Sequence, residues 1–157
     1  MKLMSSYLAS GVVAIAAMIV GSAALAQSGH FLDRTVQCTD IGTQVMCTGK
    51  VAGLGGTTFQ ILVQAEGVAS VECTNPGENV APGQSKAITT LGDSGPLPTP
   101  RNGNFTFTLA TAAPVAPADS CPNDQWTPTV VDVAFTTATL QLFEDGTLSD
   151  SLTVTVQ

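Results

Sequence analysis

The stretch TFQILVQAE, residues 58–66, alternates apolar and polar side chains along most of its length. Phe59, Ile61, Val63 and Ala65 share one face of an extended chain, and Gln60, Gln64 and Glu66 lie among the others. This alternation is typical of a half-buried β-strand, because successive side chains of a strand point to opposite faces of its sheet. The stretch therefore predicts a strand with one face in a hydrophobic core.

The same period of two recurs in three later segments, and no segment after residue 26 carries a convincing apolar stripe of helical period. The inward residues that it predicts are Phe105, Phe107 and Leu109, then Val131, Val133 and Phe135, then Leu152, Val154 and Val156. About seven to nine short strands of this kind, separated by turn signals, predict a single all-β domain. We expect an immunoglobulin-like β-sandwich, with a small β-barrel as the alternative.

Two glycine-containing segments predict tight connections between strands. Asp145-Gly146 is a preferred pair for a type I′ hairpin turn. The segment AGLGGTT, residues 52–58, has a spacing of glycines that differs from the dinucleotide-binding pattern, and a strand follows it where that pattern needs a helix. We interpret it as a second hairpin.

The first residues predict a signal peptide that is removed on export. Lys2 is followed by an uncharged apolar run from Leu8 to Ala24, and Ala24-Leu25-Ala26 fits a signal-peptidase site. A retained membrane anchor is the alternative, but the run is slightly short for one. Cleavage after Ala26 leaves residues 27–157 as one exported domain without a membrane anchor, located outside the cell or in a periplasm.

The predicted mature chain is strongly acidic. Without Lys2, four Lys and Arg residues stand against twelve Asp and Glu residues, which gives a net charge near −8. Such a surface repels nucleic-acid phosphates and anionic lipids, so neither is an expected partner. The carboxylates are scattered singly, which is typical of a solubilising surface.

The four cysteines of an exported chain predict two disulfides. If Gly42-Thr43 forms a type II′ turn, Cys38 falls opposite Cys47 at a non-hydrogen-bonded pair, where side chains approach most closely. This register predicts Cys38–Cys47, and Cys73–Cys121 follows as the remaining pair.

The loop CTNPGENVAPGQ, residues 73–84, is the best candidate for a functional surface. Asn75-Pro76-Gly77-Glu78 and Ala81-Pro82-Gly83-Gln84 both fit type II turns, which require a positive φ at the glycine. A Cys73–Cys121 bond would join this loop to the turn that begins at Cys121, with Trp126 nearby. We expect a rigid platform at one end of the sandwich, which serves either structure alone or binding.

These residues carry a resemblance. CTNPGENVAPGQ followed by CPNDQWTPTVVDVAFTTATL resembles a group of small exported bacterial proteins of uncharacterised function. The group has a Cys-x-Asn-Pro-Gly loop, an Ala-Pro-Gly-Gln turn and a later Cys-Pro-Asn-x-x-Trp segment. The resemblance covers most of the predicted mature chain and implies no activity. The Cys38/Cys47 pair is an addition to that pattern.

The sequence predicts no catalytic residue, no metal site and no cofactor. The segment GDSGP, Gly92–Pro96, resembles part of the serine-protease nucleophile motif but lacks one glycine, and the single histidine, His30, lies near the mature N-terminus, where chains fray. Calcium sites at Asp119–Asp124 or Asp145–Asp150 remain open, although neither segment fits an EF-hand loop.

We therefore expect a secreted, non-enzymatic surface or matrix protein that acts through protein contacts or self-association. The final strand, SLTVTVQ, would serve either as an internal strand or as an exposed edge for such contacts. A glycan- or calcium-binding module is the alternative.

Overall fold

The computed structural model describes residues 28–157, and the predicted signal peptide, residues 1–26, lies outside them. The described chain contains no α-helix; it forms ten strands and two short 3₁₀ turns. The elements are β1 (His30–Phe31), η1 (Asp33–Thr35), β2 (Gln37–Asp40), β3 (Val45–Ala52), β4 (Thr58–Thr74), β5 (Val80–Pro82), β6 (Lys86–Asp93), β7 (Leu97–Pro98), β8 (Phe105–Ala110), η2 (Ala118–Ser120), β9 (Thr127–Glu144) and β10 (Thr147–Thr155).

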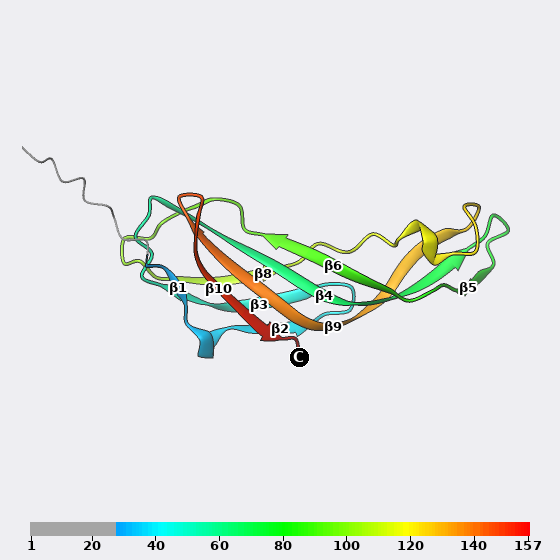
Figure 1. The fold of residues 1–157 in the computed structure, drawn as a ribbon, viewed down its shortest axis with the longest axis horizontal. Coiled ribbons are helices and arrows are strands. Elements are labelled where there is room, and N and C mark those ends of the chain that lie inside the picture. Colours follow the sequence, from blue (N-terminus) through cyan, green and yellow to red (C-terminus); the bar gives the residue numbers. More distant parts are fainter. Residues whose placement is uncertain (1–27) are drawn as a thin grey trace, which may run out of the picture.

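The strands form two sheets, which confirms the predicted β-sandwich (Figure 1). In the smaller sheet β3 lies between β8 and the pair β1 and β2. In the larger sheet β10, β9 and β4 are adjacent, and β5, β6 and β7 all pair with the far side of β4. This strand order is immunoglobulin-like. In the smaller sheet, β2, β3 and β8 correspond to strands A, B and E. In the larger sheet, β10, β9, β4 and β6 correspond to strands G, F, C and C′.

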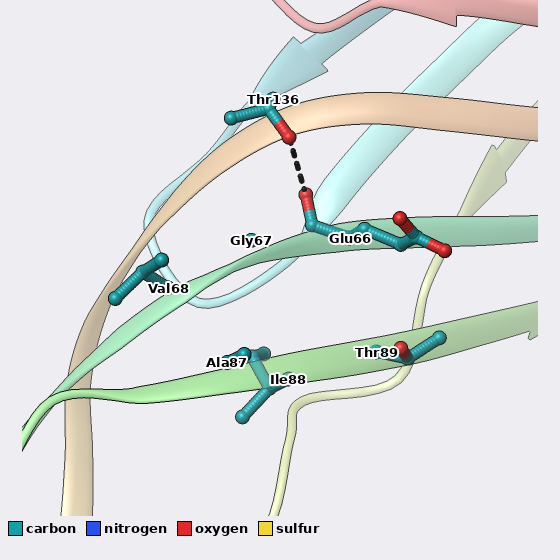
Figure 2. Close-up of a pocket in the computed structure, with 7 residues that line it drawn as sticks. All are labelled: Glu66, Gly67, Val68, Ala87, Ile88, Thr89 and Thr136. Atoms are coloured by element: carbon teal, nitrogen blue, oxygen red, sulfur yellow. Dashed lines mark hydrogen bonds between the residues drawn. The ribbon is translucent and has the colours of Figure 1, made fainter.

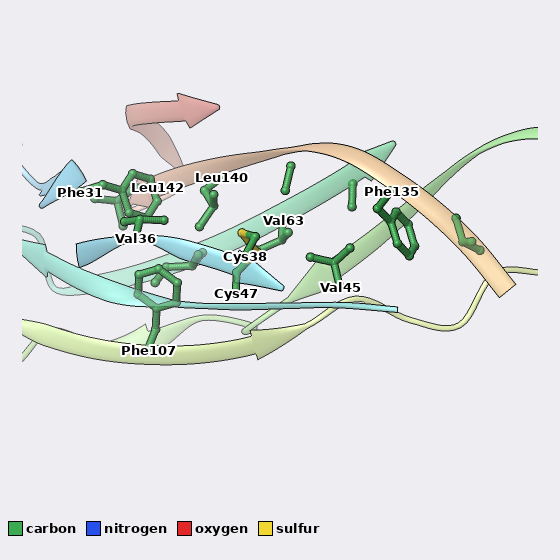
Figure 3. Close-up of a cluster of buried hydrophobic side chains, with 14 of the residues drawn as sticks. Phe31, Val36, Cys38, Val45, Cys47, Val63, Phe107, Phe135, Leu140 and Leu142 are labelled. Carbon is green, nitrogen blue, oxygen red and sulfur yellow. A yellow bond between two sulfur atoms is a disulfide. The ribbon is translucent and has the colours of Figure 1, made fainter. Parts of the chain in front are cut away.

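The core lies between the sheets and includes the inward residues that the alternation predicts, apart from Val131, together with further residues such as Val45, Leu140 and Leu142 (Figure 3). Two aromatic contacts join its layers: Phe31 meets Phe107 edge-on at 5.9 Å, and Phe59 meets Phe105 at 4.9 Å between ring centroids. The fully buried aliphatic side chains include Val45, Val51, Ile61, Val63, Val133, Leu140 and Leu142.

Val131 is an exception to the predicted core. Its side chain is 46% exposed, whereas Val133 and Phe135 are buried. The pairing of β4 with β9 shifts between Ser70 and Val71, so that Val130 pairs with Val71 and Val131 is left as an extra residue. A β-bulge of this kind changes the parity of inward and outward positions, which the alternation could not reveal.

The predicted hairpin at residues 52–58 is wrong, although the strands on either side of it are present. β3 belongs to the smaller sheet and β4 to the larger one, so this segment crosses between the sheets. The Asp145-Gly146 hairpin between β9 and β10 is confirmed, with φ of +47° at Asp145 and +81° at Gly146. Positive φ at both central positions is what a type I′ turn requires.

The final strand, β10, is the outermost strand of the larger sheet, but its C-terminal end is bonded to the smaller sheet. β10 pairs with β9, and beyond it Val156 forms a parallel bridge with Cys38 of β2. The N–H of Gln157 donates to the Cys38 carbonyl at 3.0 Å, and the N–H of Asp40 donates to the Gln157 carbonyl at 2.9 Å. The C-terminal residues thus join the two sheets along one side of the sandwich.

β4 and β9 are 17 and 18 residues long, and they continue past the end of the smaller sheet. That sheet ends at the turn around Gly42, whose carbonyl accepts a hydrogen bond from the N–H of Val133. We call the continuation the arm and define it as residues 70–86 and 112–132. In Figure 1 the arm projects from the sandwich at the end that carries β5.

Candidate functional site: the stapled arm

The arm is a ribbon of β4, β9 and β5 whose inner face is covered by the loop that follows β8. Cys73 on β4 and Cys121 on this loop form the predicted disulfide, and Cys38–Cys47 is present as well. Beside the Cys73–Cys121 bond, the N–H of Gln84 donates to the Ser120 carbonyl at 2.8 Å. Val71 and Cys73 are buried close to Ser120 of this loop, and Ala116 and Trp126 pack against the core. A small ribbon of strands needs packing on its apolar face to be stable, and the loop supplies this layer.

The disulfides differ in how much chain they close. Cys38–Cys47 links residues 9 apart, and Cys73–Cys121 links residues 48 apart. In the chain-entropy account the shorter loop contributes about 2.7 kcal/mol and the longer one about 4 kcal/mol to the free energy of unfolding. The Cys73–Cys121 bond is therefore the stronger constraint, and it acts on the arm.

The turn at Asn75 does not have the predicted type. Gly77 lacks a positive φ, which type II requires, and Glu78 has a φ of +61° instead. The N–H of Glu78 donates to the Asn75 carbonyl at 2.9 Å, and the Asn75 side chain accepts from the N–H groups of Gly77 and Asn79. Asn75 therefore fixes this hairpin through its side chain, with Glu78 in the left-handed position.

The second predicted type II turn is also absent, because Gly83 has no positive φ. Gly83 is needed for a different reason: a Cβ there would lie 2.9 Å from Cys73 Sγ and 3.0 Å from the Ser120 carbonyl oxygen. Pro82 precedes it at the end of β5. The Pro-Gly pair thus brings the backbone against the disulfide, where no side chain fits.

Trp126 and an ion pair complete the arm. The N–H of Trp126 donates to the Asn123 carbonyl at 3.2 Å, which closes the turn after Cys121, and its half-buried ring packs against the core. Lys86 Nζ lies 2.9 Å from Asp119 Oδ2. The hydrogen bond from Lys86, together with its charge, lowers the pKa of Asp119 below the ordinary value. The cover is thereby attached to the start of β6.

The outer face of the arm carries apolar side chains that nothing in the described chain covers. Val80 on β5 is 59% exposed and Val131 on β9 is 46% exposed. Val68, at the junction with the sandwich, is 48% exposed and lines an open hollow of about 490 Å³ (Figure 2). The only titratable side chain in the lining of that hollow is Glu66, so the hollow offers no pair of groups for acid–base chemistry.

The opposite end of the sandwich contains a buried carboxylate that the sequence analysis missed. Glu144 is fully buried, and its carboxylate accepts hydrogen bonds from Gly55 N–H at 2.7 Å, Gly29 N–H at 2.9 Å and the Ser149 hydroxyl at 2.7 Å. Burial alone would raise the pKa of Glu144, but these donors and Gly56 N–H outweigh it and lower the pKa. The carboxylate holds the crossover loop and the N-terminal segment together.

The neighbouring Asp145 has a similar structural role on the surface. Its carboxylate accepts hydrogen bonds from the hydroxyl and N–H groups of Thr57 and Thr58. The Thr57 hydroxyl and the two N–H groups lower the pKa of Asp145 to about 2. Asp150 accepts from Phe31 N–H at 2.8 Å. Residues 28–157 contain no group of three or more side chains able to hold a metal ion, and these carboxylates are occupied by N–H donors.

The residues considered for catalysis lie in structural positions. The Ser94 hydroxyl accepts from Ile61 N–H at 2.9 Å and donates to the Gly95 carbonyl at 2.8 Å, so neither partner is a base. The prediction that His30 lies in a frayed terminus is wrong. His30 belongs to β1 and pairs with Ala52 of β3. Its ring is exposed and contacts the Ser28 carbonyl oxygen at 3.1 Å.

Comparison with known proteins yields only distant structural similarity. The chain matches no protein-family model, and no curated protein matches its sequence. Two solved structures of a glycosyl hydrolase family 2 (GH2) member from Bacteroides cellulosilyticus resemble it at 13% identity, with TM-scores of 0.33 and 0.34. The match covers 82% of this chain but only 15% and 14% of those chains, so the chain spans about one-seventh of their length. At these values the likeness carries no argument about activity.

Proposed function

We propose that this is an exported, non-enzymatic surface or matrix protein that acts through protein contacts made by the arm. Two formed disulfides fit an oxidising compartment, and the first 26 residues fit an export signal. No helix in the described chain has the length and apolar character to cross a membrane. Outside the cytoplasm, a domain of this size can present a contact surface to other proteins.

The observation that carries this proposal is the stiffening of the arm. The projection has a disulfide, a covering loop and an ion pair on its inner side, while Val80 and Val131 stay exposed on the outer side. A surface that is ordered before binding loses less conformational entropy when a partner docks. The stiffened arm is therefore suited to repeated contact with another protein.

Site-specific photo-crosslinking on the producing cells tests this function. A photoreactive residue in place of Val80 should give one or a few discrete adducts with other protein chains. The matched control is the same residue in place of Leu148, which is 49% exposed at the opposite end of the sandwich. No adduct from position 80, or equal adducts from both positions, would contradict the proposal. Selective binding of the mature protein to a glycan array would favour the glycan-binding alternative instead.

A further inference from the structure

β8 is an edge strand whose outer side is open. Within residues 28–157 it pairs only with β3, and it borders the open side between the two sheets. An open groove of about 370 Å³ runs beside it, with apolar lining from Ile61, Leu97, Phe105, Phe107 and Leu109. Thr106 and Thr108 alternate with the aromatic residues and are exposed. The groove and the strand edge together form a surface that a further strand would complete.

The pairing of β3 identifies which backbone groups of β8 are free. Lys50 directs its carbonyl to Leu32 on the β1 side, whereas Val45 exchanges hydrogen bonds with Thr111 on the β8 side. Because these directions alternate along a strand, Cys47, Gly49 and Val51 also face β8. Their partners are Leu109, Phe107 and Phe105. The N–H and C=O groups of Thr106 and Thr108 therefore point away from the sheet.

Three other edges of the sandwich are protected, which distinguishes β8 from them; the first is β10, the outer strand of the larger sheet, which has a β-bulge between Leu148 and Asp150. The β2 edge is occupied by Gln157, and Leu91 of β6 accepts a hydrogen bond from Ala112 N–H. β6 also begins with Lys86 and ends with Asp93. Proteins usually protect an edge with charged residues, proline or a bulge. β8, with the sequence FTFTLA, has no charged residue, no proline and no shift in its pairing.

We propose that β8 pairs antiparallel with β8 of a second copy of this chain, about a twofold axis at Phe107. Thr106 then lies opposite Thr108 of the second copy, and Thr108 opposite its Thr106. Each pair exchanges both of its backbone hydrogen bonds, which gives about four in total. The arrangement is isologous and closes at a dimer. It also places threonine beside threonine, a favourable cross-strand combination.

The charge of the molecule supports a second copy as the occupant. The chain has a formal net charge of −7, so two copies repel each other except where their surfaces are locally uncharged. Residues 105–110 form such a strip. Asp93, which lines the groove, has its carboxylate bonded to Gln60 Nε2 and Gly95 N–H. Pairing through β8 thus brings the copies together where the repulsion is least.

This inference rests on the proposed function, because it assumes a protein that acts through contacts with other protein chains. It concerns a surface separate from the arm.

Sedimentation velocity of the mature, oxidised chain over a concentration series should show a monomer–dimer equilibrium. Thr108→Pro removes the outward N–H and leaves the bonds to β3, so it should weaken the dimer about 30-fold or more. Thr108→Val keeps the N–H and should change the dissociation constant less than about threefold.

If Thr108→Pro does not fold, amide hydrogen exchange tests whether β8 forms the dimer interface. In the unmodified protein the Thr106 and Thr108 amides should become protected as the concentration rises, while the Phe105 and Phe107 amides are protected throughout. A chain that stays monomeric at every concentration, or a dimer whose Thr106 and Thr108 amides exchange freely, would overturn the proposal. Either outcome leaves the crosslinking test of the arm unaffected.

Discussion

Deletion of residues 152–157 is expected to abolish folding. Leu152, Val154 and Val156 are half-buried against the core, and each contributes on the order of 1–2 kcal/mol. The deletion also removes the pairing of β10 with β9 from Leu152 onward and the bonds of Gln157 to β2. Together these losses reach much of the roughly 5–15 kcal/mol that stabilises a typical domain.

Circular dichroism and the fluorescence of Trp126 measure this effect, with the full-length mature chain as the reference. The matched control is the double variant Thr153→Ser and Thr155→Ser, because these two residues lie on the same strand with exposed side chains. We expect the control to fold and the truncated chain to give no cooperative thermal transition. A truncated chain that melts cooperatively would show that β10 is a dispensable edge.

Glu144→Gln is expected to lower the free energy of unfolding at pH 7 by about 3 kcal/mol. Both carboxylate oxygens accept hydrogen bonds: Oε1 from Gly55 N–H, and Oε2 from Gly29 N–H and the Ser149 hydroxyl. An amide has only one acceptor oxygen, so its NH₂ group must face at least one N–H donor. Glu72→Gln, on the exposed face of β4, is the control and should change little.

The pH dependence follows from the lowered pKa of Glu144. A carboxyl with a lower pKa in the folded state contributes its full stability above its unfolded pKa, and loses it as the pH falls through the folded value. The difference between wild type and Glu144→Gln should therefore be constant from pH 7 to about pH 5 and shrink below about pH 4. Urea unfolding across this range measures it. A difference that widens in acid would refute this role of the carboxylate.

The sequence predicts well those features that depend on neighbouring residues. The register of β2 with β3 follows from the Gly42-Thr43 turn, and the pairing of Cys38 with Cys47 is as expected. Gly42 has the positive φ, +99°, that the first position of a type II′ turn requires. The inward faces of β4 and β8, and of β10 beyond its bulge at Ser149, also follow from alternation, because a stretch of strand without a bulge keeps one parity throughout.

The wrong predictions share a physical cause, since each depends on residues distant in the sequence. The segment 52–58 contains hairpin residues, but whether β3 and β4 pair is decided by the sheets to which they belong. At Pro76-Gly77 the hydrogen-bonding side chain of Asn75 overrides the Pro-Gly preference for a type II turn. The donors to Glu144 come from Gly29 and Gly55, which no local pattern links to it.

The candidate site was predicted in its parts but not in its shape. Cys73, Cys121 and Gly83 lie together, whereas Gly77 lies in the turn between β4 and β5 near Asn75 and Asn79, and Trp126 packs against the core. The sequence placed them at an end of the sandwich, whereas they lie on an arm that extends beyond the smaller sheet. Only the full lengths of β4 and β9, which pair along nearly all of both strands, create that projection.

The central claim is that the Cys73–Cys121 bond stiffens the arm independently of the sandwich. Amide hydrogen exchange of the double variant Cys73→Ser and Cys121→Ser tests it most directly, with Cys38→Ser and Cys47→Ser as the matched control. Loss of the Cys73–Cys121 bond should lower the free energy of global unfolding by about 4 kcal/mol and, in addition, allow the arm to open locally. We therefore expect amides of residues 70–74, 127 and 129–132 to exchange faster than those of Ile61, Val63, Leu140 and Leu142, which exchange only when the whole domain unfolds. In the control the arm should exchange no faster than the sandwich. Arm amides that exchange at the same rate as the sandwich amides in the Cys73→Ser and Cys121→Ser variant would contradict the account.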